Sequence, residues 1–255
     1  MQIKNKTFIV TGAASGLGAT ILEQLASDGA NVVGVDINLN GNAAREDKFD
    51  GRVQFIKTDV TSAAEAEATI ALAKSAFDGV HGLVNCAGIA PGEKIVGRKG
   101  AHRLDSFNRT VSINLVGTFN MLRLAAEAMQ QAEADENGER GVIINTASIA
   151  AYDGQIGQAA YAASKGGIVS LTLPAARELA STGIRVVAVA PGIFETPMMV
   201  CMPQDVQDAL GATVPFPARM GKPAEFADMV TTIIRNQYLN GEVIRLDGAL
   251  RMAAR

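Results

Sequence analysis

The sequence predicts an α/β protein in which one parallel sheet is covered by helices on both faces. Short apolar strands alternate with longer helical segments along the whole chain. The strands are apolar at nearly every position, as is typical of strands buried on both faces of a parallel sheet. The first strand leads through a glycine-rich loop into the first helix, as in doubly wound sheets. We expect a single domain, residues 1–255, with seven strands.

The expected elements follow one another with little irregular chain between them. Strands are short runs rich in Val and Ile, whereas helices show apolar residues at helical spacing or are rich in alanine. The strands are expected at residues 6–11, 31–36, 53–57, 82–85, 141–146, 183–190 and 242–246. Helices are expected at residues 19–28, 63–77, 104–131 and 158–181, and a polar exposed loop at 130–140.

The connection between the first strand and the first helix has the chemistry of a phosphate-binding loop. Thr11–Gly18 reads Thr-Gly-Ala-Ala-Ser-Gly-Leu-Gly. Glycines let the backbone approach a pyrophosphate, and the N-terminus of the next helix supplies N–H donors and a positive dipole end. The loop follows a strand, precedes a helix and is followed by an acid at the right distance. Together these features disfavour a loop that only makes a tight turn. The residues expected to hold the pyrophosphate are Gly12, Ser15, Gly16, Leu17 and Gly18.

That acid is Asp36, which ends the second strand. It lies 18 residues after Gly18, about where dinucleotide-binding folds place a ribose-binding carboxylate. A carboxylate accepts hydrogen bonds from a 2′-hydroxyl and repels a 2′-phosphate. We therefore expect a Rossmann fold that binds NAD rather than NADP.

Tyr161 and Lys165 form a candidate acid–base pair. They stand four residues apart, about one helical turn, so both side chains share a helix face. A nearby ammonium favours phenolate over phenol and would lower the tyrosine pKa, so that the phenol could exchange a proton with an alcohol. Ser148 could hold the same substrate oxygen. Taken alone, the spacing favours a packed tyrosine and a solvated lysine, and the catalytic interpretation depends on the rest of the chain, beginning with the glycine loop and Asp36.

Composition excludes several function classes. Apolar residues make up 48% and charged residues 19% of the chain, and the net charge is −3, so neither nucleic acid nor an anionic membrane is an expected partner. No apolar stretch approaches the roughly 20 residues of a membrane span, and the early first strand leaves no room for a signal peptide. The two cysteines, Cys86 and Cys201, form neither a disulfide framework nor a metal set. We expect a cytoplasmic protein without a metal.

The ordered motifs resemble those of the short-chain dehydrogenase/reductase family along essentially the whole chain. Thr11–Gly18 is similar to the family's cofactor loop, and Asn85-Cys-Ala-Gly88 stands where the family usually has Asn-Asn-Ala-Gly. Ile113-Asn114 matches its helix asparagine, and Pro191-Gly192 follows the sixth strand. The resemblance implies that Asn114, Ser148, Tyr161 and Lys165 are the catalytic residues.

The resemblance also implies further cofactor contacts. Asp59 and Val60 would lie beside the adenine, although Asp59 fits a turn or helix-capping acid before Ser62 almost as well. Cys86 replaces the usual asparagine, which puts one cofactor-side hydrogen bond in doubt. Asn114 would anchor a water chain that carries the proton to solvent. The remaining implied contacts are Asn85, Cys86, Ala87, Gly88, Tyr161, Lys165, Pro191, Gly192, Phe194 and Thr196.

Several segments are similar to one subgroup, the type 2 3-hydroxyacyl-CoA dehydrogenases. Among them are Gly141–Ser148, Gly154–Tyr161, Val214–Pro217 and Asn240–Ala249. This resemblance implies NAD-dependent oxidation of short or branched 3-hydroxyacyl-CoA esters, with Tyr161 as acid and base, and a homotetramer. The alternatives are a hydroxysteroid or other secondary-alcohol dehydrogenase, and a scaffold role, which the intact catalytic set disfavours. The substrate is expected to contact Ser148, Gln155, Gln158 and Tyr161.

Two segments bear on substrate choice. Residues 194–222 are rich in Met and Pro, which suits an adaptable lid over an acyl chain as well as an ordinary packed loop. An insertion in the Glu93–Asp105 region could bind the phosphates of coenzyme A or simply be solvated. Its basic residues are Lys94, Arg98, Lys99, His102 and Arg103.

Overall fold

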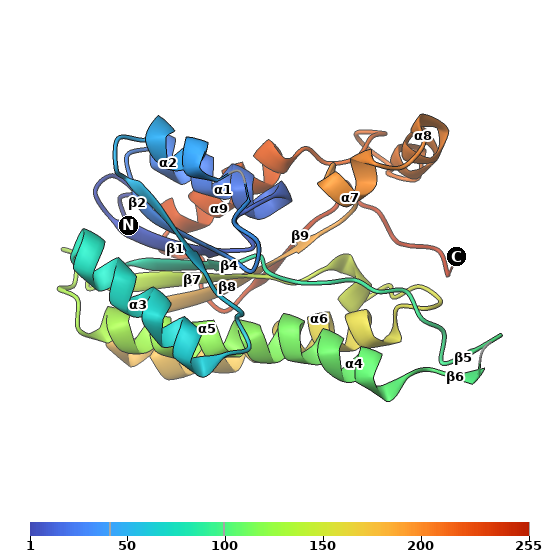
Figure 1. The fold of residues 1–255 in the computed structure, drawn as a ribbon, viewed down its shortest axis with the longest axis horizontal. Helices are drawn as coiled ribbons and strands as arrows, with labels where there is room; N and C mark the ends of the chain where they lie inside the picture. Colours follow the sequence, from blue (N-terminus) through green and yellow to red (C-terminus); the bar gives the residue numbers. More distant parts are fainter. Residues whose placement is uncertain (41, 99, 255) are drawn as a thin grey trace.

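The computed structural model describes residues 1–40, 42–98 and 100–254, apart from the side chains of residues 43, 44 and 198. Lys99 of the basic insertion therefore lies outside the described residues. Seven strands form one sheet in the order β3-β2-β1-β4-β7-β8-β9, and all of their pairings are parallel (Figure 1). The strands are β1 (Thr7–Thr11), β2 (Asn31–Asp36), β3 (Val53–Lys57), β4 (Gly82–Asn85), β7 (Gly141–Thr146), β8 (Ile184–Pro191) and β9 (Val243–Leu246). The expected fold class is confirmed.

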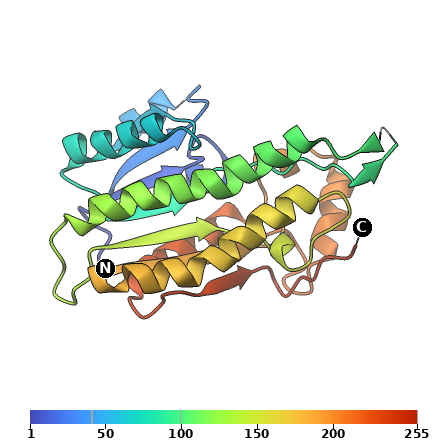
Figure 2. The same ribbon diagram turned by 90° about the horizontal axis from the view of Figure 1, so that it is seen from below.

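Helices cover both faces of this sheet because each face carries its own apolar cluster. One cluster joins α1 (Gly16–Ser27) and α9 (Pro223–Arg235) to the sheet, with Phe8, Leu22 and Phe226 fully buried. The opposite cluster joins α3 (Ala63–Phe77), α5 (Gly117–Gln130) and α6 (Ala159–Leu179). Figure 1 shows these two helical layers with the sheet between them, and Figure 2 views the face that is covered by α3, α5 and α6. Among the described residues, none of the helices combines the length and the hydropathy needed to cross a membrane.

The expected long helix at 104–131 has an irregularity in its middle. It consists of α4 (Leu104–Val111), a π-helical turn at Ser112–Val116 and α5. Asn114 lies within this turn and is fully buried. Single π-helical turns inside α-helices occur mostly at functional sites. The widened turn therefore singles out Asn114 on structural grounds as well.

Some elements were not expected from the sequence. These are α2 (Ala43–Lys48), the hairpin of β5 (Val96–Gly97) and β6 (Gly100–Ala101), α7 (Pro197–Val200), α8 (Gln204–Ala212) and α9. For α9 the signals were present. Pro223 occupies the first helical position, and the Glu225 carboxylate accepts a hydrogen bond from the Lys222 amide at 2.7 Å, as in a capped N-terminus.

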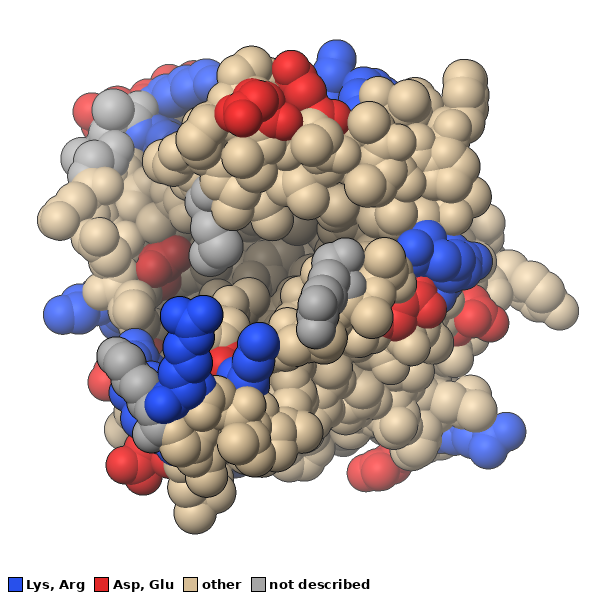
Figure 3. Space-filling view, turned by 90° about the vertical axis from the view of Figure 1, so that its right-hand side faces the viewer, with Lys and Arg blue, Asp and Glu red and all other residues tan. Residues whose placement is uncertain are grey.

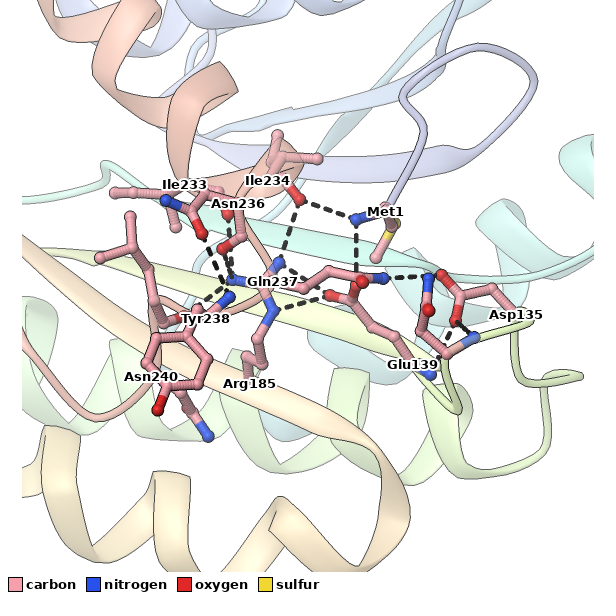
Figure 4. A network of polar contacts seen from close by, with 12 residues as sticks. Met1, Asp135, Glu139, Arg185, Ile233, Ile234, Asn236, Gln237, Tyr238 and Asn240 are labelled. Atoms are coloured by element: carbon pink, nitrogen blue, oxygen red, sulfur yellow. Dashed lines mark hydrogen bonds and ion pairs between the residues drawn. The ribbon is translucent and has the colours of Figure 1, made fainter.

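A buried arginine joins the sheet to the end of α9 (Figure 4). Arg185 on β8 donates to the Glu139 carboxylate at 2.8 Å. Its other guanidinium nitrogens donate to backbone carbonyls that follow or end α9, at 2.8–3.2 Å from Ile233, Ile234, Asn236 and Leu239. Only 6% of Arg185 is exposed, so these carbonyls have little access to water. The planar guanidinium of Arg185 therefore donates to backbone carbonyls that would otherwise be buried without hydrogen-bond donors.

We expect Arg185→Lys to lower the free energy of unfolding by about 2 kcal/mol. Lysine keeps the positive charge that pairs with Glu139, but it lacks the several N–H donors of the guanidinium, so several buried carbonyls would have no donor. Urea unfolding followed by circular dichroism would measure the change. Arg177→Lys on the exposed side of α6 is the matched control and should stay within about 0.5 kcal/mol of the wild type. Equal midpoints for the two variants would contradict this role of Arg185.

Candidate active site

A cavity of about 730 Å³ opens at the carboxyl ends of the central strands, the edge at which open α/β sheets bind ligands. Figure 3, which views the molecule from this end, shows the hollow. The cavity is lined by twelve of the residues expected to contact a cofactor, namely Gly12, Ser15, Gly16, Leu17, Gly18, Asp36, Asp59, Val60, Cys86, Ala87, Gly88 and Thr196. Its size falls within the range of small-molecule and cofactor sites.

The glycine loop is shaped to receive an anionic group. Gly12 has φ of +66°, and a Cβ on it would lie 2.9 Å from the Ala87 amide nitrogen, so only glycine fits this close approach. A Cβ on Gly18 would collide with the Gly12 carbonyl. No side chain among the described residues caps the start of α1. Its first amides are therefore available to an anion such as a pyrophosphate.

The two acids in the cavity are held by backbone amides. The Asp36 carboxylate accepts hydrogen bonds from Ala14 and Asn38, both at 3.1 Å. Asp59 accepts from the Thr61 amide at 2.9 Å. The cap of α3 is Ser62, whose hydroxyl accepts from the Glu65 amide, so Asp59 is a turn acid and not the helix cap. Asp59 also lines the cavity, and its place beside the adenine stays a prediction.

Asn114 connects the cavity wall to α6. Its Oδ1 accepts from the Ile89 amide at 2.8 Å, and its Nδ2 donates to the Ile89 carbonyl at 2.9 Å and to the Ser164 hydroxyl at 3.0 Å. A Cβ on Gly88 would lie 3.1 Å from Asn114 Oδ1 and 3.8 Å from Lys165 Nζ. Asn114, Lys165 and the loop that follows β4 thus meet at one place.

Ser148, Tyr161 and Lys165 lie close together beside the loop that follows β4. Lys165 Nζ donates to the Thr146 carbonyl at 2.6 Å and lies 5.9 Å from the centroid of the Tyr161 ring. Ser148 caps a short 3₁₀ turn by accepting from the Ala150 amide at 3.1 Å. The Ser148 hydroxyl also interacts with the Tyr161 phenol. A phenol, a hydroxyl and an ammonium in one buried cluster can bind and protonate a substrate oxygen.

Burial controls the proton affinities of this cluster. Desolvation lowers the pKa of Lys165 to about 8. Desolvation raises the pKa of Tyr161, and the hydrogen bond from Ser148 only partly opposes this. The net direction of the tyrosine pKa is therefore upward and not downward as expected, because burial of the phenol dominates.

Cys86 is a neutral thiol beside the cluster. Burial raises its pKa to about 11. Its Sγ accepts a hydrogen bond from the Thr146 hydroxyl at 3.4 Å, and the residue lines the cavity. The side chain that replaces the usual asparagine thus faces Thr146, whose carbonyl holds Lys165.

Other expected cofactor residues lie away from the cavity lining. Asn85 is buried and donates to Asn145 at 3.0 Å across the sheet. Pro191 ends β8 and Gly192 bonds to Leu246 of β9. The Phe194 ring packs edge-on against Phe226 in the core, 5.9 Å between centroids. The side chains of Asn85 and Phe194 therefore support the sheet and the core.

Some residues that line the cavity were not expected from the sequence. Arg109, Ser112 and Ile113 line it from α4 and the π-helical turn. Arg109 and Ile113 are four residues apart and so share a helix face, but neither stands three or four residues from Asn114, so spacing from Asn114 could not have found them. The other linings not expected are Val35, Ile37, Thr58, Thr61, Ile89 and Pro197.

The two glutamines expected to contact substrate lie in a separate groove. Gln155 and Gln158 line a cavity of about 400 Å³ together with Lys94, Ile95 and Val96 of the basic insertion. The Gln155 amide donates to Gln158 Oε1 at 3.1 Å. The insertion and the segment before Tyr161 therefore face each other.

The chain matches known proteins over nearly all of its length. A family model described as short chain dehydrogenase matches residues 6–207. The human 3-hydroxyacyl-CoA dehydrogenase type-2 is 51% identical over 253 residues, 98% of this chain and 97% of that protein. For the Drosophila melanogaster protein of the same name the identity is 49%, over 98% of this chain and 99% of that protein. The crystal structure of 3-hydroxyacyl-CoA dehydrogenase type-2 from Mycobacterium avium has 40% sequence identity and a TM-score of 0.94, with both chains fully covered. The chain therefore belongs to the short-chain dehydrogenase family and is a nicotinamide-dependent oxidoreductase.

Proposed function

We propose that this protein catalyses the NAD-dependent oxidation of the 3-hydroxyl group of short or branched 3-hydroxyacyl-CoA esters, and the reverse reduction. The observation that carries the proposal is the cluster of Ser148, Tyr161 and Lys165 next to a cavity of about 730 Å³ that is lined by the glycine loop and Asp36. The substrate class is supported by the human relative that is 51% identical and named 3-hydroxyacyl-CoA dehydrogenase type-2.

In this mechanism the protein binds the substrate oxygen and moves its proton. Ser148 and Tyr161 hold the 3-hydroxyl, and Tyr161 Oη takes its proton during oxidation or supplies a proton during reduction. When bound, the nicotinamide ring accepts or donates the hydride. Lys165 places a positive charge beside Tyr161 and favours the phenolate form. Asn114, which spans Ile89 and Ser164, anchors the route by which the proton reaches solvent.

Asp36 supports the preference for NAD over NADP. Its carboxylate lines the cavity at the end of β2 and is held by two backbone amides. A 2′-phosphate at this place would meet a fixed negative charge, whereas a 2′-hydroxyl would donate to it.

We expect Asp36→Ala to raise the ratio of kcat/KM for NADP to that for NAD by at least about tenfold, which corresponds to ~1.4 kcal/mol. The substitution removes both the repulsion of a phosphate and the acceptor for a hydroxyl. Initial rates with each cofactor would give the ratio. Asp47→Ala, on an exposed position of α2, removes the same charge and should leave the ratio unchanged. An unchanged ratio in Asp36→Ala would remove the basis for NAD preference.

Some of the basic side chains in the insertion form ion pairs with described residues, whereas others do not. Arg103 makes two side-chain hydrogen bonds to Glu93 at 3.1 and 3.3 Å, and these bonds hold the pKa of Glu93 at about 2. Lys94 and Arg98 are exposed and make no ion pair with any described residue. Figure 3 shows basic side chains on the rim of the hollow. We infer that Lys94 and Arg98, rather than Arg103, meet the phosphates of coenzyme A.

We expect the double variant Lys94→Gln/Arg98→Gln to raise KM for acetoacetyl-CoA about fivefold, because two exposed cations no longer attract the phosphates. KM for an acetoacetyl thioester of N-acetylcysteamine, which lacks phosphates, should not change. Lys4→Gln/Arg177→Gln, at exposed positions, controls for net charge. Equal increases for both substrates would exclude the phosphate role.

A second candidate function is the oxidation of hydroxysteroids or other secondary alcohols. The groove beside Gln155 carries exposed apolar side chains, with Ile95 70% and Val96 75% exposed, which suits an apolar ligand without phosphates.

We also propose a homotetramer in the cytoplasm. Three apolar side chains in the π-helical turn, α5 and α6 are exposed, namely Val116, Phe119 and Leu173. Subunit contacts would cover them.

A further inference from the structure

The segment Tyr152–Gln158 connects Ser148 to the helix of Tyr161 and is held from three sides. The Gly157 carbonyl accepts from the Glu93 amide at 2.9 Å. The Ile156 amide donates to the Ala254 carbonyl at 3.0 Å, and Gln155 Nε2 donates to the Ala253 carbonyl at 3.1 Å. These contacts join the segment to the basic insertion and to the C-terminal segment. The third attachment is an ion pair.

That ion pair centres on Arg245 of β9. One guanidinium nitrogen donates to Asp153 at 2.6 Å, and Nε donates to Asp247 at 2.7 Å. The guanidinium lies 5.0 Å from the centroid of the Tyr152 ring and also donates to the Leu250 carbonyl at 3.1 Å. Arg245 therefore binds the segment, the strand end and the C-terminal segment at once.

The surroundings make this pair stronger than an ordinary surface contact. The side chains of Arg245 and Asp153 are 22% and 21% exposed, and that of Asp247 is 7% exposed. Partly buried charges are screened less by water than exposed ones. The planar guanidinium can bond two carboxylates and stack on an aromatic ring at the same time, which an ammonium cannot do. The Asp153–Arg245–Asp247 arrangement is thus suited to fixing a position.

The position that it fixes lies beside the catalytic tyrosine. A Cβ on Gly154 would lie 3.1 Å from the Ala162 Cβ and 3.2 Å from the Ala150 carbonyl. The segment therefore packs between the turn that follows Ser148 and the start of α6. Lys165 is held independently by Thr146. Loss of the Arg245 contact would displace Gln155 and Gln158 while leaving the tyrosine–lysine pair in place.

We propose that Arg245 is a positioning residue for substrate binding, which acts through Asp153 on the segment that carries Gln155 and Gln158. The inference rests on the proposed function for the identity of the substrate. It assigns Arg245 to binding of the acyl ester and not to proton transfer or to cofactor binding.

The test compares Arg245→Met and Asp153→Asn with Arg251→Met. Arg251 shares the partner Asp247 but does not contact Asp153, and its side chain is 60% exposed. We expect the first two variants to raise KM for acetoacetyl-CoA about tenfold, with kcat and the Kd for NADH within about twofold of the wild type. Arg251→Met should match the wild type in all three. The double variant Arg245→Met/Asp153→Asn should be no worse than Arg245→Met alone, since both substitutions remove the same contact between Arg245 and Asp153.

A merely structural role would lower kcat through loss of folded enzyme and leave KM unchanged, and that result would overturn the proposal. Additive effects in the double variant would also overturn it. Hydrogen exchange of residues 152–158 provides a measurement that needs no substrate. Faster exchange there in both single variants, with unchanged exchange in α6, is expected, whereas unchanged exchange in residues 152–158 would contradict the proposal. If the wild type does not turn over acetoacetyl-CoA, the proposed function fails, and hydrogen exchange still decides whether Arg245 positions the segment.

Discussion

Replacing Tyr161 with phenylalanine is expected to lower kcat about 10³-fold in both directions. The ring and its packing remain, but the group that exchanges a proton with the substrate oxygen is lost, and such groups contribute about 10²–10⁴-fold. The Kd for NADH should stay within about twofold, because the glycine loop and Asp36, which line the cavity, are unchanged. Stopped-flow measurement of a single turnover would separate the chemical step from product release.

The matched control for this variant is Tyr238→Phe. Tyr238 is 99% exposed, so loss of its hydroxyl should change neither kcat nor NADH binding. A Tyr161→Phe enzyme that retained more than about a tenth of wild-type kcat would show that another group transfers the proton.

Replacing Lys165 with methionine is expected to lower kcat about 10²-fold at pH 7 and to change the pH profile. Burial lowers the pKa of Lys165 to about 8, so the ammonium is present below that pH and is lost above it. Burial also raises the pKa of Tyr161, so oxidation, which requires the phenolate, should become faster as the pH rises. Methionine removes the cation that favours the phenolate, so the loss of rate should be largest below about pH 8, where the wild type carries the ammonium, and smaller above that pH.

Rates of alcohol oxidation between pH 6 and 11 would test this sign. The expected result is a rate that rises with pH in both proteins and that in Lys165→Met is far below the wild-type rate under about pH 8 but approaches it above that pH, with an unchanged Kd for a substrate analogue. Lys222→Met, at the exposed start of α9, is the control and should keep the wild-type profile. A loss of rate of the same size at every pH would contradict the assigned role of the ammonium.

The sheet could be predicted closely because its signal is local. β2, β3 and β4 have the bounds expected from apolar runs, and α3 spans the expected residues 63–77. A buried parallel strand is apolar throughout, so its ends coincide with changes in polarity. The π-helical turn around Asn114 could not be predicted, because a single turn of five residues is too short to form a periodic pattern of its own.

The residues of the candidate site could be predicted, but their environments could not. Ser148, Tyr161 and Lys165 converge as their spacing indicated. The direction of the Tyr161 pKa shift depends on burial by residues distant in sequence. The pairing of Arg103 with Glu93 depends on how the insertion folds back on itself. Long-range contacts of this kind leave no pattern in a single sequence.

The most direct test of the account is the oxidation of NADH by the purified protein with acetoacetyl-CoA as substrate, followed by absorbance. NADPH and a free ketosteroid are run in parallel. The account predicts fast turnover with NADH and the coenzyme A ester and much slower turnover with NADPH. Turnover of the free ketone without turnover of the ester would contradict the proposed substrate class and the phosphate role of Lys94 and Arg98.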